Sequence, residues 1–301
     1  MASKQKVVAV LSLLNAATVW GLIWYPFRVL AQQGVSGELA TFITYSVALA
    51  LGLLLFGPKW RELRQAGWWG LALTLCAGWT NLGYVLAMLG GEVMRVLLLF
   101  YLAPLWTVLL SHFMLGERLN RYGYIIIALS LGGAMVMLWR PGRGLPLPQT
   151  LAEWIGLSAG IAFALTNVLV RRVQHLSINL KSAGVWFGTA LLTLAALLYH
   201  GNLGAQAAAI TPEAWWLMAA IAVVLCVTSF SVQYGLTHTP ANQAILLFMF
   251  ELVVAAVSSY LLAGEEMGAQ EIGGALLIVT ASLFSGKLHP APDDTEPAGK
   301  T

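Results

Sequence analysis

The chain has 301 residues, of which 59% are apolar and only 10% are charged, and its formal net charge is +3. A water-soluble domain of this size carries about 25% charged residues, so this chain has too little polar surface to face water on all sides. We therefore expect an integral membrane protein whose main partner is the lipid bilayer, and the small, dispersed positive charge gives no indication of nucleic-acid binding.

Ten continuous apolar segments follow one another along the chain. A helix that spans a membrane needs about 20 mostly apolar residues, whereas membrane strands would alternate apolar and polar residues. The sequence therefore predicts an all-α integral membrane protein with ten transmembrane helices. We expect them at residues 7–31, 39–56, 68–90, 93–115, 122–139, 151–170, 183–199, 214–236, 241–263 and 272–288, followed by a disordered cytoplasmic tail at 289–301.

The orientation follows from the 16 Lys and Arg residues. If the N-terminus is cytoplasmic, all but four of them lie on the cytoplasmic side, and the opposite topology reverses this distribution. Positive residues favour the cytoplasm, so we expect both termini inside, in a bacterial inner (plasma) membrane. The four residues on the outer side are then Arg28, Arg95, Arg140 and Arg143.

A weak internal repeat relates residues 93–120 to a segment 148 positions later. Gly116-Glu117 matches Gly264-Glu265, and Val93 matches Ala241, without a gap. We interpret residues 1–145 as a first five-helix repeat and residues 146–288 as a second. Because five is odd, the second repeat enters the membrane from the opposite side, and inverted repeats of this kind are typical of secondary transporters that hold substrate in a central cavity near the membrane midplane.

The pattern resembles the drug/metabolite transporter superfamily, and more narrowly its EamA-type members. The resemblance rests on ten helices in two halves, a Pro in the fourth helix, the Leu-Gly-Glu-Arg-Leu exit at residues 115–119, and Phe-Glu-Leu-Val-Val-Ala-Ala at 250–256. Leu252 stands where that family usually has Pro, so the sequence does not itself supply the kink that the resemblance implies there. Tyr-Leu-Ala-Pro at 101–104 is similar to the Tyr-Leu-Trp-Pro of bacterial aromatic amino acid exporters, from which Ala103 departs. The resemblance implies export of metabolites, with amino acids as a candidate class.

Glu251 is the acidic residue at mid-depth of an expected span, where a charge is costly and usually faces a cavity or a partner. It is either a proton-coupling carboxylate or contact for a substrate amine, or a hydrogen-bonded Glu that ties the ninth helix to its neighbours. Because the resembled family keeps Glu here across different substrates, we favour the structural role while retaining Glu251 as a candidate.

Other candidates for substrate binding are aromatic or carry amides. The resemblance places the first, fourth and sixth helices around the central cavity, where aromatic faces can stack on a substrate ring, although packing in the core is the alternative. Amides within the third, sixth and eighth spans can bind an amino acid or hold helices together. Pro104 frees a backbone carbonyl and suits a hinge. The candidates are Trp20, Tyr101 and Phe163 for stacking and Asn81, Asn167 and Gln233 for polar contacts.

No signature of an enzyme accompanies these residues. The sequence has no GxxxxGK[ST] loop, and its histidines show no HExxH spacing, so we expect no cofactor, no metal and no catalytic residue. We predict a secondary transporter that exports small amphipathic metabolites, aromatic and other neutral amino acids first, by alternating access. The alternatives are a lipophilic drug or cation exporter, with Glu251 as counter-ion, and an intramembrane enzyme. A monomer is sufficient because one chain supplies both halves.

Overall fold

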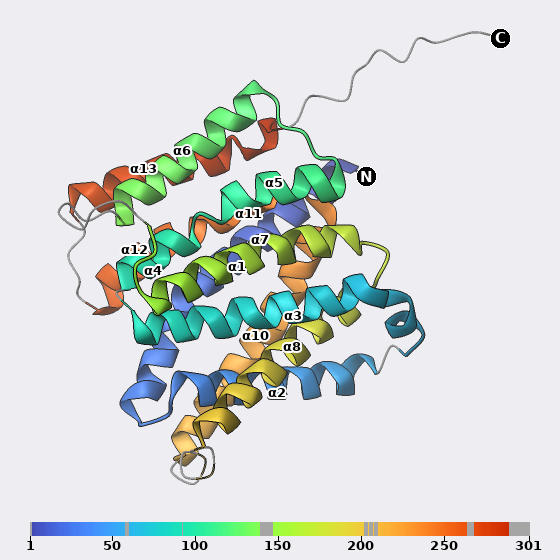
Figure 1. Ribbon diagram of the computed structural model, residues 1–301, viewed down its shortest axis with the longest axis vertical. Helices are drawn as coiled ribbons and strands as arrows, with labels where there is room; N and C mark the ends of the chain where they lie inside the picture. Colours follow the sequence, from blue (N-terminus) through green and yellow to red (C-terminus); the bar gives the residue numbers. More distant parts are fainter. Residues whose placement is uncertain are drawn as a thin grey trace.

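The computed structural model describes residues 2–57, 60–91, 93–138, 147–201, 204, 207, 210–263 and 268–288, and these are helical with short connections (Figure 1). Nine of its helical segments are long and apolar enough to cross a membrane, and the shorter apolar helix Ala269–Leu283 follows them within the described residues. The elements are α1 (Ala2–Gln32), α2 (Gly37–Phe56), α3 (Trp60–Gly90), α4 (Val93–Phe100), α5 (Ala103–Leu115), α6 (Arg121–Leu138), α7 (Leu151–Arg172), α8 (Ile178–His200), α10 (Pro212–His238), α11 (Ala241–Phe248), α12 (Phe250–Ala263), α13 (Ala269–Leu283) and the 3-10 turn η1 (Ser285–Lys287).

The all-helical class expected from the sequence is confirmed, and each expected span has a helical counterpart. Two spans are interrupted: the fourth, where Pro104 predicted a bend, consists of α4 and α5, and the ninth, which has Leu252 in place of the proline, consists of α11 and α12. The expected tail at 289–301 and the repeated Gly264-Glu265 pair lie outside the described residues.

Four of the helices begin at a hydroxyl residue that accepts a hydrogen bond from the backbone N–H three positions later. The caps are Ser36 for α2, Thr150 for α7, Ser177 for α8 and Thr211 for α10. Each such cap satisfies an otherwise unpaired donor and stabilises its helix by about 1 kcal/mol. The sequence therefore marks these helix starts locally, next to the apolar runs that form the spans.

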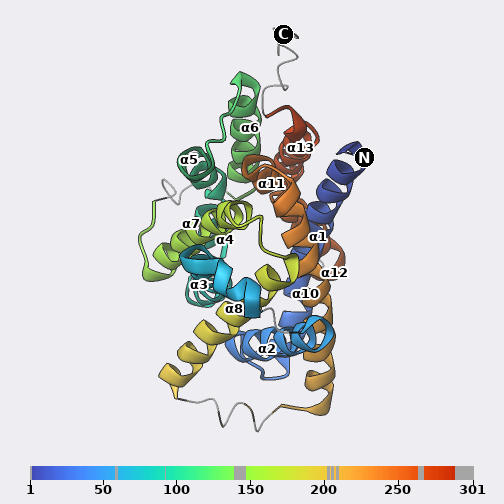
Figure 2. The same cartoon turned by 90° about the vertical axis from the view of Figure 1, so that its right-hand side faces the viewer.

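The helices pack as a bundle with α6 and α13 side by side at one edge and α2 and α8 at the other (Figures 1 and 2). Between these edges α3 packs on α7, and α1 packs on α10. The broken spans lie inside, with α4 and α5 against α7 and with α11 and α12 against α1. Exchanging the first five spans with the second five leaves this pattern of neighbours unchanged.

Small residues allow the closest helix contacts. A Cβ atom placed on Gly133 of α6 would lie 2.8 Å from the carbonyl oxygen of Gly274, and one placed on Gly274 would lie 2.5 Å from the carbonyl oxygen of Gly133. Both distances are too short for a side chain, so the backbones of α6 and α13 touch directly. Such contacts of small residues are the usual means of packing helices in a membrane.

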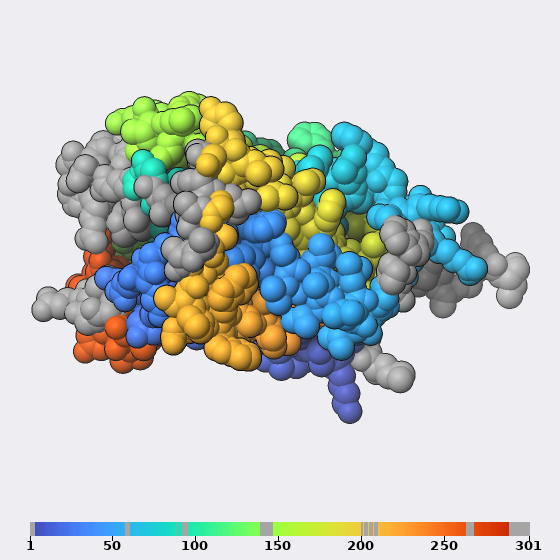
Figure 3. All heavy atoms as spheres, turned by 90° about the horizontal axis from the view of Figure 1, so that it is seen from below, coloured from blue at the N-terminus to red at the C-terminus, as the bar shows by residue number. Residues whose placement is uncertain are grey.

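The outer surface is apolar. The face seen in Figure 3 is built largely from α2, α8 and α10, with parts of α1 and α3 beside them. On these helices Leu54, Tyr199 and Trp216 are 82%, 88% and 79% exposed. Apolar side chains this exposed suit hydrocarbon and headgroup contact rather than water, which agrees with a bundle that lies in a bilayer.

Candidate functional site

The fourth span is interrupted at Tyr101 and Leu102, between α4 and α5. Pro104 lies in the first turn of α5, where its missing N–H needs no intrahelical partner. Pro104 is buried, and it stands directly after the interruption rather than inside a continuous helix. The bend expected near Pro104 is therefore present, and its use as a hinge remains a prediction.

The ninth span is interrupted at Met249, 148 residues after Tyr101, although Leu252 replaces the proline there. Two hydroxyl groups from outside the span bind at this interruption. Ser130 of α6 donates to the Met249 sulfur at 2.9 Å, and Ser282 of α13 donates to the carbonyl of Leu246 at 3.2 Å. Polar side chains of neighbouring helices thus bind backbone and sulfur atoms at membrane depth, and the kink does not require proline.

Glu251 lies in the first turn of α12, immediately after this interruption. The start of a helix carries partial positive charge, so a carboxylate is stabilised there more than in the middle of a span. The Tyr101 hydroxyl hydrogen-bonds to the Glu251 carboxylate, and Tyr84 of α3 is close enough to interact with the same charge. The two interrupted spans therefore meet at a carboxylate with two tyrosines beside it.

Tyr101 belongs to a set of five rings in contact with one another, which we call the aromatic cluster: Tyr84, Phe100, Tyr101, Phe163 and Phe248. Phe100 stacks on Phe163 with 5.5 Å between ring centroids and 17° between planes. Tyr84 contacts Phe100 edge-on at 5.2 Å, and Phe163 lies 5.5 Å from Phe248. The structure thus brings together three of the candidate residues, Tyr101, Phe163 and Glu251.

Trp20 lies near the aromatic cluster, whereas Asn81 has a separate set of contacts. Trp20 of α1 is half-buried and packs, like Phe163, against the buried cluster that contains Phe248. The Asn81 amide of α3 accepts a hydrogen bond from the Tyr45 hydroxyl of α2 at 2.7 Å and donates to Thr189 of α8 at 3.3 Å. Asn81 therefore connects three helices, which is the alternative role that the sequence left open for the amides.

Asn167 and Gln233 are buried on α7 and α10, and each has an amide atom without a hydrogen-bond partner among the described residues. The atoms are Nδ2 of Asn167 and Oε1 of Gln233. A buried polar atom that stays unpaired costs about 1–3 kcal/mol, so these two groups differ from Asn81. Their predicted role in binding a polar part of a substrate remains a prediction.

Glu117 closes one end of the bundle, which we call the basic end because Arg118, Arg121, Arg171, Arg172, Lys181 and Lys287 lie there. Its carboxylate accepts hydrogen bonds from the backbone N–H groups of Ala241 and Asn242 at 3.0 and 3.4 Å, so the first half caps the start of α11. The Asn242 side chain donates to Glu117 at 3.0 Å and to Ser111 at 2.8 Å. The sequence marked Glu117 only as part of a repeated helix exit.

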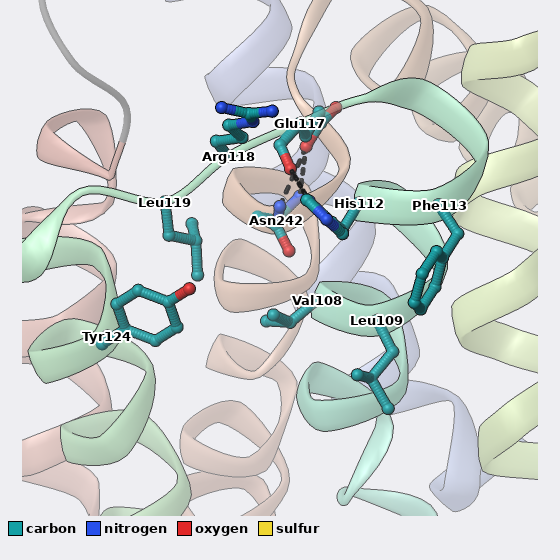
Figure 4. A pocket seen from close by; sticks show the side chains of 9 residues that line it. All are labelled: Val108, Leu109, His112, Phe113, Glu117, Arg118, Leu119, Tyr124 and Asn242. Carbon is teal, nitrogen blue, oxygen red and sulfur yellow. Dashed lines mark hydrogen bonds between the residues drawn. The ribbon is translucent and has the colours of Figure 1, made fainter.

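Beside this contact a groove of about 400 Å³ opens between α5, α6 and α11 (Figure 4). Val108, Leu109 and Phe113 line its apolar part, and His112, Arg118 and Tyr124 supply polar groups. The groove adjoins the Glu117–Asn242 contact but does not include the aromatic cluster. Its walls belong to α5, the segment that follows α5, and the starts of α6 and α11.

Two cations of the basic end bind the same residue. Lys181 of α8 donates to the Thr237 hydroxyl, and Arg171 of α7 donates to the Thr237 carbonyl of α10. In the sequence both residues indicate only the orientation of the chain, because a positive charge near a span end has no distinctive spacing. Tyr84 was also missed, since one aromatic residue among many carries no signal of its own.

Comparison with known proteins shows which family and which solved fold the chain resembles. The model of the EamA-like transporter family matches residues 7–139 and 150–286. An uncharacterised transporter of Pseudomonas aeruginosa is 26% identical over 221 residues, which cover 70% of this chain and 71% of that protein. A probable terminal-alkyne amino-acid exporter of Streptantibioticus cattleyicolor is 28% identical over 216 residues, 67% of this chain and 68% of that protein. A chain of known crystal structure superposes with a TM-score of 0.75 over 92% of this chain and 96% of its own length at 19% identity, which shows a common fold.

Proposed function

The chain belongs to the EamA-like transporter family, and from this premise we propose that it is a secondary transporter that exports neutral, amphipathic metabolites, aromatic amino acids first, by alternating access. The family and the names of its relatives point to a multi-pass membrane transporter rather than to an enzyme. The name of the Streptantibioticus relative supports amino acids as the substrate class.

The unchanged pattern of neighbours on exchange of the two halves supports an inverted repeat of five and five helices. The interruptions of the fourth and ninth spans lie 148 positions apart, as do the matched residues of the repeat. Broken helices at a repeat interface are typical of substrate sites in secondary transporters. In this proposal the two halves rock about the interruptions near Pro104 and Met249.

The observation that carries the substrate class is the Glu251 carboxylate among the rings of the aromatic cluster. A carboxylate at a helix break can bind a substrate amine, while the rings of Phe163 and Tyr84 offer faces to an aromatic side chain. Glu251, Tyr84 and Phe163 are each only partly buried. A substrate with an amine and a ring therefore fits this meeting point best.

The positive-inside rule supports placing the basic end in the cytoplasm of a bacterial cell, with both termini on that side of the inner membrane. The Glu117 contact then holds the start of α11 closed on the cytoplasmic side. In this proposal the contact breaks when the substrate enters from the cytoplasm. One chain supplies both halves, so a monomer is sufficient for the cycle.

A lipophilic cation exporter is the second candidate, because Glu251 suits a cationic ligand as well as an amino acid amine. Counterflow separates the two functions. Purified protein in liposomes should accumulate labelled phenylalanine against trapped tryptophan or methionine, and not against trapped glutamate or a lipophilic cation. Export of a lipophilic cation without exchange of any amino acid would contradict the proposal.

The Glu251→Gln variant tests the role of the carboxylate in the same assay. We expect the KM for phenylalanine to rise about 10–100-fold, because a charge-assisted hydrogen bond to the amine is worth about 1.5–3 kcal/mol. Glu213→Gln is the matched control, since Glu213 also lies in the first turn of a helix but is exposed. Unchanged transport by a folded Glu251→Gln variant would leave Glu251 with a structural role.

A further inference from the structure

Lys181 is the most buried cation of the chain's described part, with 1% of its surface exposed. It lies in the first turn of α8, and its ammonium donates to the Thr237 hydroxyl. An ammonium buried without a carboxylate costs several kcal/mol, because neutral oxygens replace water only in part. The cost of burying this ammonium falls when an anionic group binds next to it during function.

Arg171 adds a second cation to the same place. Its guanidinium donates to the Thr237 carbonyl, so α7 and α8 both direct a positive charge at one residue of α10. Within the part of the chain that the structure describes, these partners are neutral oxygens. Two converging cations with neutral partners are arranged to receive an anion, and they repel a cation.

Polar atoms without partners lie one helical turn from this pair. Asn167 precedes Arg171 by four residues on α7, and Gln233 precedes Thr237 by four residues on α10, so each pair lies on one helix face. Nδ2 of Asn167 and Oε1 of Gln233 are unpaired within the described residues, as is the hydroxyl of Ser182 next to Lys181. The set offers donors to an anion and one acceptor to an amine.

We propose that Lys181, Arg171 and Asn167 bind the carboxylate of the transported amino acid, while Gln233 accepts a hydrogen bond from its amine. This inference rests on the proposed function and adds to it a second substrate-binding position, which we call the carboxylate site. The substrate carboxylate replaces the Thr237 oxygens, because a hydrogen bond between charged groups is about twice as strong as one to a neutral group. Half-exposed Arg171 and Thr237 connect the buried Lys181 with the surface of the basic end.

One face of α7 connects the carboxylate site with the aromatic cluster. Phe163, Asn167 and Arg171 occupy successive turns, about 6 Å apart, so about 12 Å separates the ring from the guanidinium along the helix. An aromatic amino acid held by its carboxylate near Asn167 reaches the level of Phe163 with its ring. The substrate therefore passes from the cations of the basic end to the rings and Glu251.

The test measures counterflow of phenylalanine in proteoliposomes with the full chain. We expect Lys181→Met to raise the KM for phenylalanine about tenfold or more, the effect of one lost charge-assisted hydrogen bond. Phenethylamine, which lacks the carboxylate, should inhibit the variant and the unmodified protein equally. Lys181→Arg should keep the KM within about threefold, because it retains the charge. Lys287→Met is the matched control, since it removes an exposed charge from the same end.

Arg171→Gln provides a second variant if Lys181→Met does not fold, which thermal unfolding and gel filtration establish beforehand. It should raise the KM for phenylalanine, again without changing inhibition by phenethylamine. An unchanged KM in the folded variants, with the unmodified protein transporting phenylalanine, would overturn this inference and leave the proposed function intact. A loss of maximal rate at constant KM would also overturn it, because it would assign these residues to structure. Failure of the unmodified protein to transport phenylalanine would instead contradict the proposed function itself.

Discussion

The two interrupted spans show how different residues produce the same break. The fourth span has Ala103-Pro104 after its interruption, and the ninth has Glu251-Leu252 at the matching positions. The first pair is apolar and contains a residue that ends helices by its covalent structure. The second pair contains no such residue and instead carries a charge at the start of α12.

The difference shows that one break is encoded locally and the other by neighbouring helices. Next to the first break, a Cβ atom on Gly160 of α7 would lie 2.5 Å from the Phe100 carbonyl oxygen, so α7 packs directly on the end of α4. At the second break, Ser130 and Ser282 bind Met249 and Leu246. Because neighbouring helices hold the second break, the positions after it do not need a proline. One of these positions is Glu251, which places a carboxylate there.

The largest effect should come from moving proline into the ninth span. Leu252→Pro installs in α12 the residue that α5 has at the matching position, in a first turn where a missing N–H removes only the bond from Leu252 to the Met249 carbonyl at 3.1 Å. Val257→Pro places the same ring in the middle of α12, where it should lower the free energy of unfolding by about 3 kcal/mol or more. We expect Leu252→Pro to cost clearly less, measured by reversible unfolding in detergent micelles.

Val257 is a suitable site for the comparison because it is 41% exposed, so its substitution removes little packing. Equal losses for both variants would contradict the idea that a helix start at Phe250 tolerates proline. The position of the break would then depend on the Leu252 side chain, which is 4% exposed.

The parts of the fold that depend on local residue patterns are predictable from the sequence. Length of apolar run, hydroxyl caps such as Ser177, and the order of the repeat predict the ten spans, because each is a property of neighbouring residues. The break at Met249 is not predictable in this way. Its partners Ser130 and Ser282 are 119 and 36 residues distant along the chain, and nothing in the local sequence distinguishes them from other serines.

The candidate site divides along the same line. Glu251 and Pro104 stand out because a charge and a proline are unusual inside a span. The hydrogen bond between Tyr101 and Glu251 depends on the packing of two halves. The buried state of Lys181 depends on three helices, and from the sequence it resembles any positive residue near a span end. An unusual residue type inside a span thus identifies a candidate site residue, but only the tertiary structure shows which residues it contacts.

A medium effect should follow from Glu117→Gln, which tests how the first half fixes the start of the ninth span. The variant keeps the side-chain length but removes the charge that accepts from Ala241 and Asn242, so the free energy of unfolding should fall by about 1–2 kcal/mol. Asn242→Ala in the same background should show coupling of about 0.5–1 kcal/mol with Glu117→Gln. Glu271→Gln, which removes a carboxylate that caps its own helix α13, is the control without such coupling. Additive losses for Glu117→Gln and Asn242→Ala would mean that the two residues act independently, against the contact in the structure.

The smallest effect should come from the hydroxyls at the second break. Ser130→Ala and Ser282→Ala each remove one hydrogen bond between helices, and such bonds contribute about 0.6 kcal/mol on average in a membrane protein. The double variant should therefore lower the free energy of unfolding by about 1 kcal/mol, while Ser231→Ala, whose hydroxyl bonds only within α10 to Val227, should change it less. Because Glu251 lies in the first turn of α12, directly after this break, the double variant should also weaken phenylalanine counterflow more than Ser231→Ala does. Unchanged stability and counterflow would show that the break persists without the two hydroxyls, and helix packing around Met249, which is 1% exposed, would then be sufficient to hold Glu251 in place.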